Sequence, residues 1–204
     1  MALLTRGARR GRAGHVGRGA GTLLALTLCA ALLLALSPAV GQRLSEVEVR
    51  AGFLYNFARF VEWPPGAGPE GSQPFVIAVL GDPELAQALR AGLAGKRLRG
   101  HTLEVRDVRN LDGIDEVHLL WIGKGWQARL REVLERLGER PVLTVSEIPG
   151  FAGRGGIIEL YRLGSRFRFS IDERAAGVRG LRISSRLLSL SRPRPAAARG
   201  EGTR

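Results

Sequence analysis

Three short apolar runs constrain what this chain can fold into more than any other feature. They occupy Phe75–Leu80, Val117–Ile122 and Val142–Val145. A continuous apolar run of this length is typical of a β-strand that is covered on both faces. Helical segments separate the runs. The sequence therefore predicts an α/β fold, a single three-layer domain in which helices flank a mixed β-sheet.

Further elements are predicted around these three strands. Leu103 and Val105 alternate with polar neighbours, which is typical of a half-exposed strand. Asp82 is a good N-cap residue, and Pro83 fits the first position of the helix that follows. The other predicted elements are that helix to about Gly92, a helix over Gln127–Leu137, a hairpin of Ile157–Tyr161 and Arg166–Ile171, a short helix after Asp172, and a helix over Ser184–Leu190.

The first helix of the domain begins at a capping box formed by Ser45 and Glu48. It is predicted to run to Glu62, because the following Trp-Pro-Pro-Gly stretch forbids its continuation. Its broad apolar face holds Val47, Ala51, Phe53, Leu54, Phe57, Ala58, Phe60 and Val61. Arg50 falls inside this apolar arc. Because an unpaired buried charge is very unfavourable, we expect a carboxylate or a group of backbone carbonyls within hydrogen-bond distance of Arg50.

The two ends of the chain are expected to lie outside the folded domain. Residues 1–41 combine an arginine-rich start, the apolar run Leu23–Leu36 and small residues before Gly41, which together resemble a secretory signal peptide. Cleavage after Ala39 and cleavage after Gly41 both fit this pattern. Residues 42–191 are then the domain, and 192–204 a disordered basic tail. In a bacterium with an outer membrane, the exported product is periplasmic.

Cysteine content and charge exclude several classes of protein. The only cysteine, Cys29, lies in the predicted signal peptide, so the exported domain has no disulfide, thiol nucleophile or cysteine metal ligand. The formal charge of +12 is concentrated at the two ends of the chain. Because residues 42–191 carry 22 basic and 18 acidic residues, a nucleic-acid partner is not expected.

The local signatures of catalysis or cofactor binding are largely absent from the sequence. His101 and His118 lie on different predicted strands without further ligands at metal spacing, so no metal site is predicted, and His118 reads as a hydrogen-bonded core histidine. The Gly123-Lys124-Gly125 segment lacks the rest of a phosphate-binding loop and is interpreted as a tight turn. No cofactor is predicted. A basic cluster is either a solvated sheet face or a binding patch, and consists of Arg154, Arg162, Arg166 and Arg168.

The segment Pro149–Gly156 contains four glycines and one aromatic residue, Phe151. A glycine-rich loop loses much conformational entropy on folding, so it usually serves either an unusual backbone geometry or the close approach of a partner. Both interpretations remain open at this stage. Trp63 and Trp126 flank regular elements and are expected near the surface.

Several segments together resemble the YfiR-like family of periplasmic proteins. Residues 49–64, with the sequence VRAGFLYNFARFVEWP, look like the opening helix of that family. Residues 141–156, PVLTVSEIPGFAGRGG, resemble its glycine-rich segment, and residues 181–188, LRISSRLL, are similar to its closing stretch. The resemblance runs in order over about residues 43–191. The motif residues with an expected structural role are Phe53, Leu54, Asn56, Phe57, Phe60, Pro64, Gly150, Ser184 and Ser185.

The resemblance implies a non-enzymatic α/β regulator, often dimeric, that binds the periplasmic sensor domain of an inner-membrane signalling protein. The expected client is a diguanylate cyclase, which the protein inhibits, although some relatives accompany sensor kinases. The alternative is a periplasmic protein that binds a small molecule and acts with a sensor kinase or a transport system. Control through disulfides cannot carry over, because the exported domain has no cysteine.

A regulator of this kind is expected to bind its partner through exposed aromatic and arginine side chains, because such residues dominate interface energetics. The first candidates lie in the glycine-rich loop, and the second choice is the region of the opening helix. The candidate partner-binding residues are Phe151, Arg154, Gly155 and Gly156, followed by Trp63, Tyr55 and Arg59.

Overall fold

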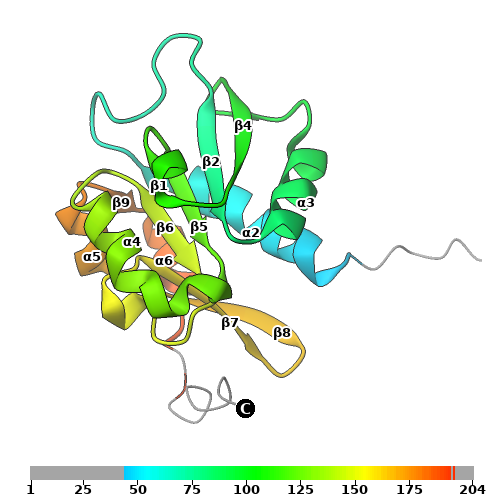
Figure 1. Cartoon of the computed structure of the whole chain (residues 1–204), viewed down its shortest axis with the longest axis vertical. Helices are drawn as coiled ribbons and strands as arrows, with labels where there is room; N and C mark the ends of the chain where they lie inside the picture. Colours follow the sequence, from blue (N-terminus) through cyan, green and yellow to red (C-terminus); the bar gives the residue numbers. More distant parts are fainter. Residues whose placement is uncertain (1–43, 194, 196–204) are drawn as a thin grey trace, which may run out of the picture. The chain divides into compact units, whose positions relative to one another are not determined.

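The computed structural model describes residues 44–193 and 195 (Figure 1). The predicted signal peptide and most of the predicted tail lie outside the described residues. None of the helices in the described part of the chain is long and apolar enough to cross a membrane.

The elements follow the expected alternation of strands and helices, with three short 3₁₀ helices among them. The helices are α2 (Glu46–Arg59), α3 (Pro83–Leu93), η1 (Leu111–Ile114), η2 (Lys124–Arg129), α4 (Leu130–Leu137), η3 (Ala152–Arg154), α5 (Glu173–Val178) and α6 (Ser185–Leu190). The strands are β1 (Val61–Glu62), β2 (Phe75–Leu80), β3 (Arg97–Leu98), β4 (His101–Val108), β5 (Leu119–Ile122), β6 (Leu143–Ser146), β7 (Ile158–Leu163), β8 (Arg166–Ile171) and β9 (Arg182–Ile183).

Seven of the strands form one mixed sheet in the order β3-β4-β2-β5-β6-β7-β8. The five central strands are parallel to their neighbours, whereas β3 and β8 pair antiparallel at the two edges. Strands β1 and β9 pair separately as a two-stranded ribbon. The predicted α/β domain with a mixed sheet is therefore confirmed.

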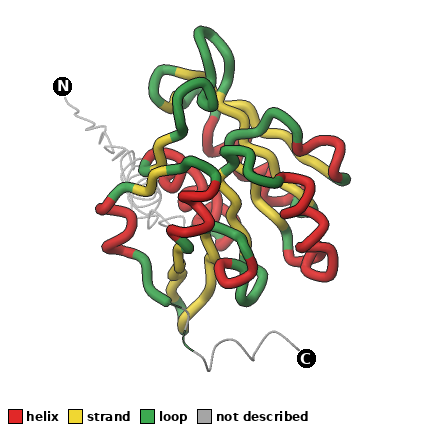
Figure 2. The backbone as a smooth tube through the Cα atoms, turned by 90° about the vertical axis from the view of Figure 1, so that its left-hand side faces the viewer, coloured by secondary structure: helices red, strands yellow, loops and turns green. Residues whose placement is uncertain are grey.

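Helices cover both faces of the sheet, as the uninterrupted apolar strands require (Figure 2). All six side chains of β2 are buried. Phe75, Ile77 and Val79 pack in one core with residues of α2 and α3, while the intervening residues pack in a second core with α4. Strand alternation thus divides the apolar side chains between two cores, and the domain has three layers.

Helix α2 begins where the sequence predicts but ends earlier than expected. The capping box is present: the Ser45 N–H donates to Glu48 Oε2 at 2.7 Å, and the Glu48 N–H donates to Ser45 Oγ at 3.3 Å. The helix ends at Arg59 rather than at Glu62. Val61 and Glu62 instead form β1. Helical geometry is disfavoured next to the prolines that follow, and pairing with β9 satisfies the backbone N–H and C=O groups of these two residues.

Two other expected boundaries also move. The predicted helix over Gln127–Leu137 is divided into the 3₁₀ helix η2 and the α-helix α4, which begins only at Leu130. Arg192, which the sequence assigns to the tail, is bonded to the domain: the Arg192 N–H donates to the Phe169 carbonyl at 2.8 Å, and the Tyr161 hydroxyl donates to the Arg192 carbonyl at 2.9 Å. These bonds make Arg192 part of the folded domain.

His118 lies at the entry to β5 and joins that strand to β2. Its Nδ1 accepts a hydrogen bond from the Val76 N–H at 3.0 Å, and its ring stacks on Phe75 with centroids 4.8 Å apart. The hydrogen bond expected for His118 is confirmed, but the side chain is half-buried rather than enclosed in the core. Burial lowers the pKa of His118, and the positive charge of Arg106 and the nearby His101 lower this pKa further.

The lowered pKa of His118 predicts that the domain loses stability in mild acid. As the pH falls, the unfolded chain takes up a proton at the ordinary histidine pKa of about 6.5, before the folded chain does. Stability is therefore full above that pH and decreases below it. In urea unfolding between about pH 7.5 and pH 5, His118→Asn, whose amide oxygen can replace the Nδ1 acceptor, should show a shallower decrease than the unaltered protein. An equal decrease in both would contradict this role.

Candidate functional site

The order of the parallel strands singles out one end of the sheet. From β2, the chain first adds β4 on one side and then β5, β6 and β7 on the other. The loops that leave β2 and β5 therefore run to opposite sides of the sheet. In open α/β sheets, ligands bind beside the carboxyl ends of the strands at such a switch point. The residues that follow β2, β5 and β6 are thus the first place to look for a site.

Two glycines allow the turns after β2 and β5 to approach each other closely. A Cβ on Gly123 would lie 2.6 Å from the Gly81 carbonyl oxygen. Gly81 has a positive φ of 73°, and a Cβ there would lie 2.6 Å from the indole of Trp126. The Gly123 turn is therefore held by packing against its neighbour, which agrees with the interpretation of this segment as a tight turn.

Charged side chains from α2 and from three strand ends meet at this point. Arg50 Nη1 lies 3.1 Å from Asp82 Oδ2 and 3.9 Å from Glu147 Oε2, and Lys124 Nζ lies 3.3 Å from the same Glu147 oxygen. The carboxylate partner expected for Arg50 is therefore present. The Arg50, Asp82 and Glu147 side chains are each less than one-fifth exposed, so these ion pairs are shielded from much of the solvent.

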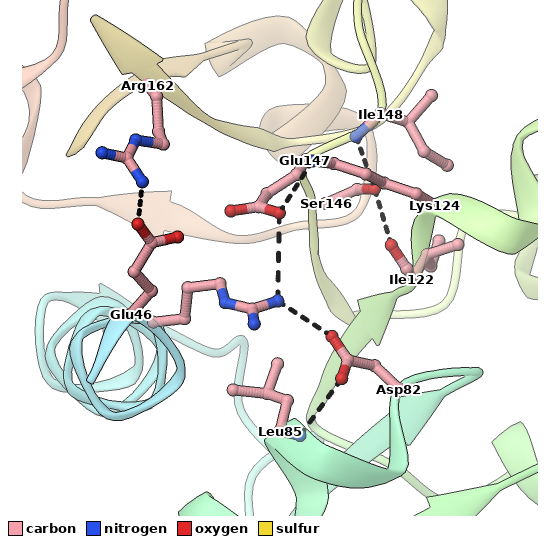
Figure 3. Close-up of polar contacts among 10 residues, drawn as sticks. Glu46, Asp82, Leu85, Ile122, Lys124, Ser146, Glu147, Ile148 and Arg162 are labelled. Carbon is pink, nitrogen blue, oxygen red and sulfur yellow. Dashed lines mark hydrogen bonds and ion pairs between the residues drawn. The ribbon is translucent and has the colours of Figure 1, made fainter. Parts of the chain in front are cut away.

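Local hydrogen bonds fix the Asp82 carboxylate and the backbone next to Glu147 (Figure 3). Asp82 caps α3 by accepting from the Leu85 N–H at 3.1 Å. Next to Glu147, the buried Ser146 hydroxyl donates to the Ile122 carbonyl at 2.6 Å and accepts from the Ile148 N–H at 3.0 Å. The carboxylate positions are thus set by the ends of β2, β5 and β6 rather than by Arg50 alone.

The four charged side chains line a pocket of about 760 Å³, which we call the switch-point pocket. Its far side carries a fourth ion pair, between Arg162 of β7 and Glu46 of α2 (Figure 3). Trp121 of β5 also lines it; this side chain is only 1% exposed, and its indole Nε1 has no hydrogen-bond partner among the described residues. The lining residues are Glu46, Arg50, Gly81, Asp82, Trp121, Lys124, Gly125, Gln127, Glu147, Pro149, Leu160, Tyr161 and Arg162.

The expectation that Phe151 is an exposed anchor for a partner is wrong. Phe151 is 0% exposed and packs in the core beneath α4. A Cβ on Gly156 would lie 2.2 Å from the Phe151 ring, so this glycine serves the approach of an internal ring. Gly150 and Gly155 have positive φ angles of 75° and 91°. The loop is therefore structural, and of the four first-choice residues Arg154 offers an exposed charged side chain.

The second-choice candidates on α2, Tyr55 and Arg59, form part of a cluster of aromatic and basic side chains at the surface. The Arg59 guanidinium lies 5.8 Å from the Tyr55 ring centroid and 6.0 Å from that of Phe60. Lys96 Nζ also lies over the Tyr55 ring, 5.4 Å from its centroid. The guanidinium of Arg186, in α6, lies 5.6 Å from the Phe60 centroid. We call these five residues the α2 aromatic surface. Arg59 is exposed, while Tyr55 and Phe60 are half-buried.

The two tryptophans expected near the surface, Trp63 and Trp126, are half-buried. Trp63 is half-buried and meets the Phe75 ring edge-on at 5.0 Å, with its indole Nε1 buried. Trp126 lies against Gly81 and carries the Arg129 guanidinium 4.6 Å from its ring centroid. Trp63 therefore contributes mainly to packing, beyond the rim position expected for it.

The family-motif residues mostly build the fold. Leu54 and Phe57 are buried, and Phe57 meets Phe169 of β8 edge-on at 5.0 Å. Ser184 caps α6, and its N–H donates to the Phe60 carbonyl at 2.9 Å, which ties the closing stretch to the end of α2. The others lie as follows: Phe53 on β8 through Phe167 and Phe169, Asn56 bonded to Gly52, Pro64 against Gly180, Gly150 bonded to Glu159, and Ser185 at the start of α6.

Sequence reasoning did not assign Asp82, Lys124 and Glu147 to one site. A signal was available, because each is a charged residue within two positions of the end of a buried strand. What the sequence lacked was the order of the strands. Among the described residues, no group of three or more His, Cys, Asp or Glu side chains could hold a metal ion. The paired charges can form hydrogen bonds in several directions, which suits non-covalent binding.

The strand order and this site define the class of protein as a doubly wound α/β domain with a polar pocket at its switch point. A comparison with protein families gives the particular group: the chain belongs to the family described as DUF4154, YfiR/HmsC-like, which matches residues 47–192. The match covers nearly all of the described residues and confirms the resemblance seen in the sequence. No curated protein matches the chain.

The packing of Phe151 predicts different effects of two glycine substitutions in the same loop. Gly156→Ala places a methyl group against a ring that is enclosed by the core, so it should lower the free energy of unfolding by about 1–3 kcal/mol. Gly153→Ala is the matched control, because a Cβ there meets nothing within 4 Å; its effect should stay below about 0.5 kcal/mol. Urea unfolding measures both. Equal effects would mean that the ring can move aside.

The Arg50 ion pairs predict that removing the cation is better tolerated than removing its partner. After Arg50→Met, Glu147 keeps Lys124 and Asp82 keeps the Leu85 N–H. After Asp82→Ala, α3 loses its cap, worth about 0.5–2 kcal/mol, and the half-buried guanidinium keeps only the longer contact to Glu147. The melting temperature should fall further for Asp82→Ala. The reverse order, or no change in either variant, would contradict a pairing role for Arg50.

Proposed function

We propose that this protein is a non-enzymatic periplasmic regulator that binds the periplasmic sensor domain of an inner-membrane signalling protein. The observation that carries the proposal is the family match, which runs through nearly the whole described domain. The family is known for periplasmic regulators of cyclic-di-GMP signalling. The proposed client is a diguanylate cyclase, and the proposed effect is inhibition.

A regulator without chemistry of its own acts by binding one state of its client better than another. It therefore needs a surface with strong contact residues. Tyrosine and arginine are enriched among the residues that dominate binding energy. The α2 aromatic surface presents both types together, with Arg59 stacked over Tyr55 and Phe60. We therefore place the client contact on α2 rather than on the glycine-rich loop.

A groove next to this surface extends the area available to a partner. It has a volume of about 930 Å³ and lies between α2 and α3. Its walls share small or apolar side chains, so a partner can approach the helix backbones closely. They include Leu44, Val47, Ala51 and Gly52 on one side and Ala88, Ala91, Gly92 and Leu93 on the other, with Tyr55 and Lys96 at one end.

The second candidate function is that of a periplasmic small-molecule-binding protein acting with a sensor kinase or a transport system. The switch-point pocket favours it, because a pocket of this size with convergent polar groups is typical of small-molecule sites. The two functions are compatible, since a bound small molecule can control a regulator.

The proposed client contact predicts a selective loss of binding. Tyr55→Ala combined with Arg59→Ala should weaken binding to the purified periplasmic domain of the client by about 2 kcal/mol or more. The double variant should stay folded with a moderately lower melting temperature, because Arg59 is exposed whereas the half-buried Tyr55 ring packs against the core. In cells, the double variant should change the cyclic-di-GMP level as gene deletion does.

Arg131→Ala provides the matched control for this experiment. The Arg131 side chain is 90% exposed on α4, on the opposite face of the sheet from α2, and its one ion pair among the described residues is with Glu135. The control should bind the client like the unaltered protein. Unchanged client binding by the folded double variant would show that the α2 aromatic surface is not the contact.

A further inference from the structure

We propose that the switch-point pocket binds a neutral, hydroxyl-rich small molecule, of the chemical class of a mono- or disaccharide. The inference concerns this pocket and does not rest on the proposed client. The first argument is its position. Side chains from α2, β5, β7 and the ends of β2 and β6 converge at the carboxyl ends of the parallel strands, beside the switch point. The volume, about 760 Å³, lies within the range of small-molecule sites.

The charges of the pocket select against a ligand with a net charge. Three cations and three anions line it, and every one of the six has a partner of opposite sign: Arg50 with Asp82 and Glu147, Lys124 with Glu147, and Arg162 with Glu46. A net charge brought into this balanced set would lose its hydration without gaining an unpaired counter-ion. A zwitterion would compete with the existing ion pairs for the same charged groups. A neutral ligand does neither.

The paired groups still have hydrogen-bonding capacity that hydroxyl groups can use. Arg50 makes one hydrogen bond among the described residues, to Asp82, although a guanidinium has five N–H donors. Glu147 takes part in two ion pairs and has no further partner there. A hydroxyl group can accept from the guanidinium and donate to the carboxylate at the same time. Each such bond involves a charged group and is therefore stronger than a bond between neutral groups.

Trp121 supplies an independent sign of an incomplete hydrogen-bond network. Its side chain is 99% buried in the pocket wall, and the indole N–H has no acceptor among the described residues. Buried donors are almost always paired, and an unpaired one is unfavourable. Because Trp121 forms part of the pocket wall, a ligand bound in the pocket changes the surroundings of this indole N–H.

The site is also held in a fixed geometry before any ligand binds. Asp82 is fixed by the cap of α3, and Glu147 follows Ser146, whose hydroxyl bridges β5 and β6. Fixed polar groups lose little conformational entropy when they bind a ligand. Arg50, Asp82 and Glu147 are each less than one-fifth exposed, whereas the exposed Lys124 side chain can move aside for a ligand.

The tryptophan indole groups provide a direct test, because the chain has three tryptophans: Trp63, Trp121 and Trp126. We would label the purified domain with ¹⁵N at the indole nitrogens, assign the Trp121 signal from a Trp121→Phe variant, and titrate with glucose, trehalose and N-acetylglucosamine. The expected result is a saturable shift of the Trp121 indole signal with at least one saccharide. The Trp63 signal should not move, since its ring packs on Phe75 at the other end of β2.

Two variants connect the shift to the pocket. Glu147→Gln removes the charged acceptor with little change in volume and should weaken saccharide binding by about tenfold or more. Glu132→Gln, at an exposed position on α4, is the control and should bind like the unaltered protein. Titrations with inorganic phosphate and with glycine betaine test the selection against charge. Neither should move the Trp121 signal.

Three results would overturn the proposal. The first is no change in the Trp121 signal with any saccharide in the folded protein. The second is a response to phosphate or glycine betaine in place of the saccharides, which would replace the ligand class. The third is a saccharide response that Glu147→Gln leaves unchanged. Because no client is present in these titrations, the outcome is separate from that of the client-binding experiment.

Discussion

The burial of the central strands on both faces is the constraint on which the rest of the structure depends. Every residue of β2 and β5 is buried, so each face of the sheet needs its own helical layer. Polar chemistry is thereby excluded from the faces of these strands. It can occur only at the strand ends and on the outer sides of the helices, and the switch-point pocket and the α2 aromatic surface lie in these two places.

Helix α2 connects these two places. Leu54 and Phe57 enter the core, Arg50 reaches the strand ends, and Arg59 faces the solvent over Tyr55. A half-buried ion pair adds little net stability, because desolvation of the charges offsets most of their attraction. Its contribution here is geometric. The contacts of Arg50 with Asp82 and Glu147 link α2 to the ends of β2 and β6.

The sequence specified the fold better than the site, for a physical reason. Period and capping are local, so the limits of β2, the cap at Ser45 and the need to pair Arg50 could all be predicted from neighbouring residues. The identity of the Arg50 partners could not, because it depends on which strands lie next to each other. Glu147 is almost a hundred residues away along the chain, and only the order β2-β5-β6 brings it close.

The glycine-rich loop shows a second limit of local reasoning. Its glycines did indicate the close approach of another group, but the pattern cannot tell an external partner from an internal ring. Here the approaching group is Phe151 of the same loop, which occupies the space that a side chain on Gly156 would need. A segment whose glycines are used internally has few side chains left for a partner. The contacts of a regulatory protein built on this fold must then come from elements that keep long side chains outside, and α2 retains them at Tyr55 and Arg59.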